Sequence, residues 1–260
     1  MKIWAVANQK GGVGKTTSTV SLAGVLIMRG YRVLMLDLDP HGSLTSYFGL
    51  DPDEVDPSLY NLFQRSLSPS DVLYDTGFEN LALIPAASAL ATLDKQLGAK
   101  EGMGLIIAET LKELESDYDY VLIDCPPMLG LLMVNALAAC ERLIIPVQTE
   151  FLALKGLQRM THTLEMITKA RKKTIQYTIV PTLFDRRVKA SIESLKKMRE
   201  DYAHWIWPGV IPIDTTFRDM SSKGIPLTIA RPSNRGGRAY AALIDYLLDV
   251  ESHSELCHAE

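Results

Sequence analysis

The chain has 260 residues, of which 47% are hydrophobic and 22% charged, with a formal net charge of −4 and a pI of about 5.8. That length and composition are enough for one well-buried core, and they exclude a disordered or fibrous protein. The acidic average argues against a protein covered in nucleic acid, although it leaves room for a local basic patch.

In chain order, the alternation of apolar runs and helix-period segments predicts a strand over 2–8, a helix over 16–30, a strand over 31–39, a surface excursion with one short helix over 51–70, and a short strand over 81–86. The elements expected next are a helix over 102–116, strands over 120–127 and 141–148, a helix over 151–172, a strand over 175–184, a helix over 188–202, a strand over 206–213 and a last helix over 236–250. Gly30 should end the first helix, and two prolines should stop the strand at 127.

Near-continuous apolar strands separated by helices predict an α/β fold with a mostly parallel, twisted sheet and helices on both faces. We expect a single domain over 1–250 and a polar, acidic C-terminal tail over 251–260. Ligands of such sheets bind at the carboxyl ends of the strands. The motifs described below lie at such ends.

Cysteine usage and hydropathy favour a cytoplasmic protein. The three cysteines, Cys125, Cys140 and Cys257, are widely spaced and form no CxxC pair, which argues against a zinc site or a disulfide framework. The apolar run at the N-terminus is too short for a signal peptide, and no stretch reaches the ~18 apolar residues of a membrane-spanning helix. The acidic end of the chain is unlike a basic amphipathic anchor, so we expect no membrane insertion.

A glycine-rich loop, GGVGKT at 11–16, lies between a predicted strand and a predicted helix. Glycines let the backbone approach phosphate oxygens, and the loop N–H groups and the positive helix end would point at the anion. Lys15 should reach the β and γ phosphates, the Thr16 hydroxyl should hold Mg²⁺, and Thr17 is placed to contact the α phosphate. The residues expected to contact phosphate through the backbone are Gly11, Gly12, Val13 and Gly14.

Three aspartates, Asp37, Asp39 and Asp124, lie at predicted strand ends. A carboxylate in the position of Asp124 should bind Mg²⁺ through water. Asp37 lies on the same side of its strand as Asp39 and is expected to support the Mg²⁺ shell and Thr16. Helix capping is the alternative for any one aspartate, but three beside one phosphate loop favour a magnesium site.

Several ordered motifs carry a resemblance to a known family. The motifs are KGGVGKTT at 10–17, DLDPHGSLTSYFG at 37–49, VLIDCPPMLGLLMVNAL at 121–137, IPVQTEFLALKGL at 145–157, VPTLFDRR at 180–187 and IPIDTTFRDMSSKGIPL at 211–227. On these motifs the chain resembles the ParA/MinD family of deviant Walker A P-loop ATPases, from residue 2 to about 248. The resemblance implies ATP or ADP with Mg²⁺ as ligands and slow ATP hydrolysis.

The resemblance also implies roles for single residues. Lys10 would reach the nucleotide of a partner subunit, so that two chains dimerise with ATP, and Asp39 would position the attacking water. The residues expected to line the adenine pocket are Thr182, Pro212 and Asp214, the last standing where partition ATPases commonly have Asn. His41 replaces the usual Gln and is expected to be a surface residue of the switch loop, and Cys125 a packing residue.

Two branches of the family remain open. Partition ATPases of bacterial chromosomes or plasmids act through non-specific DNA binding, and orphan members position a protein cargo at the cell pole. The stretches KIWAVANQKGG, DPHGSLTSYF and QTEFLALKGLQRM are most similar to ParA-like proteins that place chemotaxis arrays at the pole. That reading predicts a cargo or adaptor protein and a polar receptor as partners, with enrichment of the protein at the pole or the nucleoid of a bacterial cell.

A cluster of basic residues offers a surface for DNA. Its members are Arg186, Arg187, Lys189, Lys196, Lys197 and Arg199, on or beside the helix predicted over 188–202. By the resemblance, Arg187 stands at a DNA-contact position of the family, whereas Thr216 stands where partition members have a second arginine and Arg218 is near it. The DNA contacts expected are Arg187, Lys189 and Arg218. The alternative is a solvated helix face, because Glu193, Glu200 and Asp201 are interspersed among the basic residues.

Overall fold

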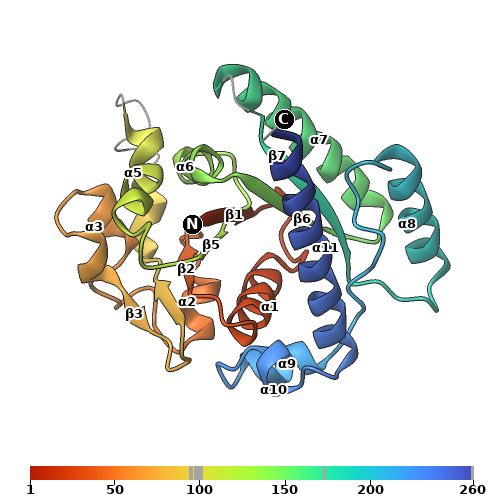
Figure 1. The fold of residues 1–260 in the computed structure, drawn as a ribbon, viewed down its shortest axis with the longest axis horizontal. Coiled ribbons are helices and arrows are strands. Elements are labelled where there is room, and N and C mark those ends of the chain that lie inside the picture. Colours follow the sequence, from red (N-terminus) through yellow and green to blue (C-terminus); the bar gives the residue numbers. More distant parts are fainter. Residues whose placement is uncertain (94–95, 97–101, 172–173, 259–260) are drawn as a thin grey trace.

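The computed structural model describes residues 1–93, 96, 102–171 and 174–258. In this part of the chain, seven strands form one sheet in the order β3-β4-β2-β5-β1-β6-β7 (Figure 1). The strands are β1 Lys2–Val6, β2 Val33–Asp37, β3 Tyr74–Asp75, β4 Leu81–Ile84, β5 Tyr120–Asp124, β6 Arg142–Gln148 and β7 Gln176–Thr182. Only β3, at one edge, runs antiparallel to its neighbour, so the predicted mostly parallel α/β sheet is confirmed.

Helices cover both faces of this sheet (Figure 1). On one face lie α1 Lys15–Met28, α2 Ser43–Tyr47, α9 Thr216–Ser221, α10 Leu227–Ala230 and α11 Arg235–His258. On the other face lie α3 Leu59–Phe63, α5 Ile106–Glu113, α6 Leu131–Ala139, α7 Phe151–Arg171 and α8 Lys189–Asp201. Short 3-10 turns occur at η1 Pro69–Val72, η2 Ser88–Thr92 and η3 Met103–Leu105.

The alternation of side chains along β1 explains the two layers. Trp4 and Val6 are fully buried in a cluster with α1 and α11, whereas Ala5 is buried in a second cluster with α6 and α7. Successive residues of a strand point to opposite faces, so a run that is apolar at every position requires cover on both sides. Gly30, with φ of 85°, follows the end of α1 as expected for a left-handed capping residue.

The strand predicted over 206–213 is wrong. This segment makes only two isolated parallel bridges, Ile179 with Ile206 and Phe184 with Pro212. Two prolines in the segment lack an N–H donor and cannot continue a ladder of hydrogen bonds. The helix predicted over 102–116 is also shorter, since η3 and α5 together end at Glu113.

The last helix is longer than predicted and passes the boundary expected at residue 250. Glu251 lies within α11, with 14% of its side chain exposed. Its carboxylate accepts a hydrogen bond of 2.7 Å from the Trp4 indole and lies 3.7 Å from the buried Arg142 guanidinium. The first residue of the expected tail therefore belongs to the packed structure. No helix in the described ranges is both long and apolar enough to span a bilayer.

Replacing Glu251 with alanine should destabilise the fold. The substitution leaves the Trp4 indole and the mostly buried Arg142 without this partner, which should lower the free energy of unfolding by about 2 kcal/mol. The matched control is Asp245→Ala on the same helix, whose ion pair with Arg29 is mostly exposed and should contribute little. Urea denaturation of both variants measures the difference, and equal midpoints would contradict the assigned role of Glu251.

Candidate nucleotide site and arginine cavity

The glycine-rich loop connects the end of β1 to the first turn of α1. Gly12 and Gly14 have φ values of 72° and 90°, a region that favours glycine because other residues are strained there. A Cβ atom on Gly11, by contrast, would meet nothing within 4 Å. The fold of the single chain therefore requires glycine at 12 and 14, whereas any crowding at 11 must come from a molecule outside the chain.

Two buried polar side chains hold this loop in place. The Asn8 amide donates to the Pro146 carbonyl at 2.7 Å and accepts from the Lys10 N–H at 3.0 Å. The Thr182 hydroxyl donates to the Val13 carbonyl at 2.8 Å. The sequence motif did not single out Asn8, because its partner Pro146 is distant in the chain.

Thr16 and Asp124 come together at the carboxyl ends of the strands. The Thr16 hydroxyl donates to Asp124 Oδ2 at 2.6 Å, while the buried Oδ1 has no hydrogen-bond partner among the residues that the structure describes. Burial, and then the nearby Asp37 carboxylate, raise the pKa of Asp124 above the ordinary range of a carboxyl group. A buried carboxylate oxygen with no partner, next to a hydroxyl, fits a divalent cation that neutralises the charge.

Asp37 differs from the expectation. Its Oδ2 accepts two hydrogen bonds of 2.8 Å from the N–H and hydroxyl of Thr45, and its Oδ1 accepts from the Asp39 N–H at 3.1 Å. The carboxylate is thus directed at α2 rather than at Thr16. Asp37 fixes the start of the segment that carries Asp39. Its support of a metal shell stays a prediction.

Asp39 lies just beyond β2, with 14% of its side chain exposed. Its Oδ1 accepts from the N–H of His41 at 3.1 Å and contacts His41 Nδ1 at 2.9 Å. The His41 side chain is 82% exposed, which agrees with the expected surface position. Cys125 is fully buried, and burial raises the pKa of its thiol, as suits a packing residue.

Lys10 is held by its own chain. Its ammonium group donates to Gln148 Oε1 at 3.2 Å and forms an ion pair with Glu150. Both partners lie where β6 leads into α7. The Lys10 ammonium group is therefore directed at the residues between β6 and α7 and not at the glycine loop. Lys15, by contrast, lies at the end of this loop, as the first residue of α1.

A cavity of about 260 Å³ opens beside the loop and contains all three residues predicted for the base pocket. Its walls include Val13, Gly14, Thr17, Thr182, Pro212, Asp214, Phe217, Arg218 and Tyr240. Partial burial acts to raise the pKa of Asp214, but hydrogen bonds to Thr216 and Gly236 outweigh it and lower the pKa below its usual value. Asp214 is therefore an ionised acceptor, able to bind an amino group.

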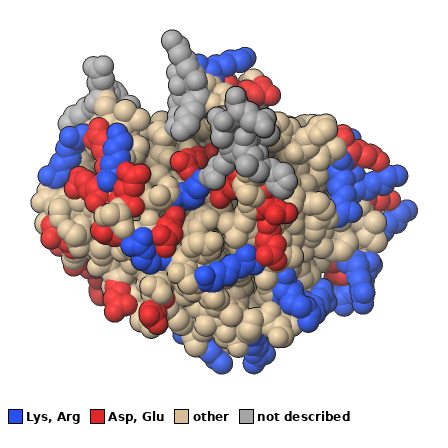
Figure 2. Space-filling model, in the orientation of Figure 1, with Lys and Arg blue, Asp and Glu red and all other residues tan. Residues whose placement is uncertain are grey.

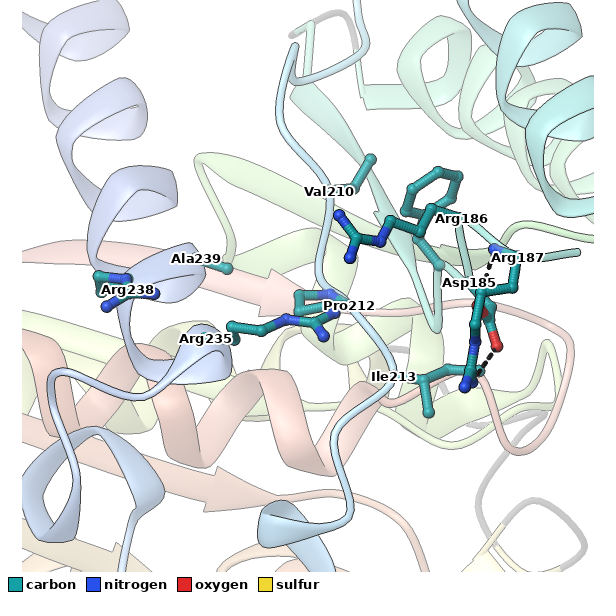
Figure 3. Close-up of a pocket in the computed structure, with 10 residues that line it drawn as sticks. Asp185, Arg186, Arg187, Val210, Pro212, Ile213, Arg235, Arg238 and Ala239 are labelled. Carbon is teal, nitrogen blue, oxygen red and sulfur yellow. Dashed lines mark hydrogen bonds and ion pairs between the residues drawn. The ribbon is translucent and has the colours of Figure 1, made fainter.

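A second cavity, which we call the arginine cavity, shares Pro212 and Ile213 with the first and measures about 660 Å³. Its charged lining residues are Asp185, Arg186, Arg187, Arg235 and Arg238. Arg235 reaches from α11 toward Pro212, and Arg187 folds back on Asp185 (Figure 3). The sequence did not assign Arg235 and Arg238, because only the folded chain brings α11 beside the loop at 184–187.

The basic cluster predicted around α8 divides into two parts. Three lysines on the helix are paired with acids four residues later: Lys189 with Glu193, Lys196 with Glu200, and Lys197 with Asp201. Figure 2 shows acidic side chains among the basic ones over α8. This helix is therefore a solvated face on which these lysines are balanced by acids, whereas the arginine cavity holds four arginines and one acid, Asp185. Arg218 lies apart, at the smaller cavity.

Comparison with known proteins identifies the family. A family model described as an AAA domain matches residues 1–177. The sporulation initiation inhibitor protein Soj of Bacillus subtilis is 34% identical over 243 residues, which cover 93% of this chain and 96% of Soj. The chain belongs to the ParA/Soj family of deviant Walker A P-loop ATPases.

Two further similar proteins extend the comparison. The chromosome partitioning protein ParA of Caulobacter vibrioides is 32% identical, with 96% of this chain and 95% of the relative covered. A Mycobacterium smegmatis structure named cobyrinic acid a,c-diamide synthase, with bound ATP analogue and magnesium, is 33% identical and has a TM-score of 0.81. It covers 95% of this chain and is covered to 94%.

The pKa of Asp124 predicts how stability depends on pH in the absence of divalent cations. In the fold this carboxyl group keeps its proton to about pH 8, against a usual pKa of 3.8. The native state therefore binds more protons than the unfolded state between these values, and the free energy of unfolding should fall as pH rises through this window. Asp124→Asn should flatten that fall, as measured by urea midpoints at several pH values. A wild-type stability that rises over the same range would refute the assignment.

Proposed function

We propose that this protein is an ATP-dependent dimerising switch of the partition type, which hydrolyses ATP slowly and binds DNA without sequence specificity. The observation that carries the proposal is the contact of 2.6 Å between Thr16 and Asp124, whose buried Oδ1 has no hydrogen-bond partner in the described part of the chain. The Mycobacterium smegmatis relative with an ATP analogue and magnesium supports the same ligands here.

Residues of this chain account for each part of the nucleotide. Backbone N–H groups of the loop and the first turn of α1 would bind the phosphates, with Lys15 offsetting their charge. Thr16 and Asp124 would hold Mg²⁺, which would supply positive charge to offset that of the phosphates. The base would enter the smaller cavity, where the ionised Asp214 can accept from the adenine amino group.

Dimerisation would recruit Lys10. Two facing nucleotides repel each other, so a lysine supplied by each chain to the other nucleotide would make association depend on ATP. Lys10 would then leave Gln148 and Glu150, its partners in the single chain. Open space at Gly11 leaves room for a close approach of the partner. Asp39 would orient the attacking water with the oxygen that His41 does not hold.

The arginine cavity supports DNA as the partner. Guanidinium groups bind phosphate oxygens in bidentate fashion, and four arginines line the cavity, of which Arg187 is paired with Asp185. The Caulobacter relative is named a chromosome partitioning protein, which favours a DNA-dependent role and a place at the nucleoid. Chemotaxis arrays as cargo, with an adaptor and a polar receptor, remain a prediction of the sequence motifs that the relatives named above do not support.

Asp39→Ala should separate assembly from hydrolysis. This variant should bind ATP with Mg²⁺ and dimerise, but its turnover should fall at least about 100-fold, because the attacking water is no longer oriented. Light scattering with ADP and with ATP measures the dimer, and phosphate release measures turnover. The matched variant Lys10→Ala should bind ATP yet stay monomeric. Unchanged hydrolysis in Asp39→Ala, or an ATP dimer of Lys10→Ala, would remove the corresponding role.

Arg187→Glu should weaken DNA binding without changing nucleotide affinity. A phosphate contact replaced by a repulsive carboxylate should cost roughly 10-fold in affinity and lower the slope of log affinity against log salt by about 1. Mobility shifts at several salt concentrations measure both quantities. The matched control Lys196→Glu makes the same charge change on α8 and should have a smaller effect. Equal losses in the two variants would place the DNA surface elsewhere.

A further inference from the structure

A chain of hydrogen bonds connects the segment that holds Lys10 to the arginine cavity. Thr149 lies between Gln148 and Glu150, the two residues that bind the Lys10 ammonium group. The Thr149 hydroxyl contacts the Ser191 hydroxyl at 2.6 Å. Ser191 Oγ in turn accepts from the N–H of Asp185 at 3.2 Å.

Asp185 is in turn hydrogen-bonded to Arg187. The Asp185 carboxylate accepts from the backbone N–H of Arg187 at 3.0 Å, from Nε at 2.9 Å and from an Nη at 2.7 Å (Figure 3). Three bonds to one carboxylate fix both the backbone and the guanidinium plane of Arg187. The orientation of the arginine proposed to contact DNA therefore depends on where the N–H of Asp185 is held.

The same loop is tied to the nucleotide site at its other end. Thr182, which donates to the Val13 carbonyl, also accepts from the N–H of Thr149 at 3.1 Å through its own carbonyl. Leu183 follows with φ of 52°, a strained conformation for a residue other than glycine. Such strain persists only where the surroundings hold the backbone on both sides. The loop at 183–187 is thus clamped between the glycine loop and Thr149.

The hydroxyl groups of Thr149 and Ser191 are both buried. Thr149 is 4% exposed and Ser191 is 5% exposed, so water cannot readily replace either partner. A buried polar group that loses its partner carries a desolvation cost, which keeps the two hydroxyls together. A shift of the segment at 148–150 would therefore move Ser191 and, with it, the backbone N–H of Asp185.

We propose that Thr149 and Ser191 are positioning residues that couple the placement of Lys10 to the orientation of Arg187, so that the affinity for DNA depends on the bound nucleotide. The inference rests on the proposed function. When Lys10 leaves Gln148 and Glu150 for the partner nucleotide, the segment around Thr149 loses its cation. The hydroxyl pair transmits the resulting shift to Asp185, and thereby to Arg187.

The test removes one hydroxyl at a time in the non-hydrolysing Asp39→Ala protein. Affinity for a duplex of arbitrary sequence is measured with ADP and with ATP and Mg²⁺. Typical coupling between two sites is about 5–150-fold, and we expect such a ratio in the parent protein. Thr149→Val, which keeps the shape of the side chain, and Ser191→Ala should reduce the ratio at least about threefold toward one. ATP-dependent dimerisation, measured by light scattering, should persist in both.

Matched variants distinguish coupling from a general loss of stability. Thr149→Ser keeps the hydroxyl and should restore the ratio, and Ser194→Ala removes another buried hydroxyl of α8 and should leave it unchanged. Coupling is reciprocal, so DNA should raise the preference for ATP over ADP by the same factor in the parent and by less in the two coupling variants.

Each outcome decides between the two proposals. A parent protein that prefers DNA with ATP, together with variants that keep its full ratio, would overturn the coupling role and leave the DNA function intact. A parent protein that binds DNA equally with both nucleotides, or not at all, would overturn the proposed function and the coupling with it.

Discussion

The parallel register of three neighbouring strands sets two buried carboxylates side by side. Asp124 at the end of β5 is paired with Asp37 of β2 on one side and with Val6 of β1 on the other. β1 leads directly into the glycine loop, so the same register brings both acids to the start of α1. Two acids buried together repel each other when ionised, and each neighbouring group of the site offsets part of that charge.

The two acids are stabilised by different means. Asp37 accepts three hydrogen bonds from Thr45 and Asp39, so its partners all come from the chain itself. Within the described ranges, the Asp124 carboxylate accepts one hydrogen bond, from Thr16, and its other oxygen has no partner. The Asp37 carboxylate therefore orders the segment from Asp39 to Thr45, while the Asp124 carboxylate has an oxygen available for a cation. Structural support and ligand binding are thus divided between two residues of the same type.

The sequence predicts the parts of the site that are contiguous in the chain. The glycine loop, Lys15, Thr16 and the strand-end aspartates follow from motif spacing and apolar runs, and the structure places them together. The partners of Asn8 and Ser191 lie far along the chain or arise from the packing of a loop, and no local pattern shows them. The segment 206–213 is misread for a related reason: Ile206, Trp207 and Ile211 are apolar because they pack into the core beside the sheet, and the segment forms only isolated bridges with it.

The arginine cavity has one fixed wall and one adjustable wall. Arg235 and Arg238 belong to the first turns of α11, a helix of 24 residues that spans about 36 Å. Farther along the same helix, the Glu251 carboxylate accepts a hydrogen bond from the indole of Trp4 in β1. Because α11 is one continuous helix held at Glu251, its first turns cannot shift far at the cavity without disturbing the packing of the core. Any change in the width of the cavity must therefore come from the wall opposite α11, which residues 184–187 and 210–213 form.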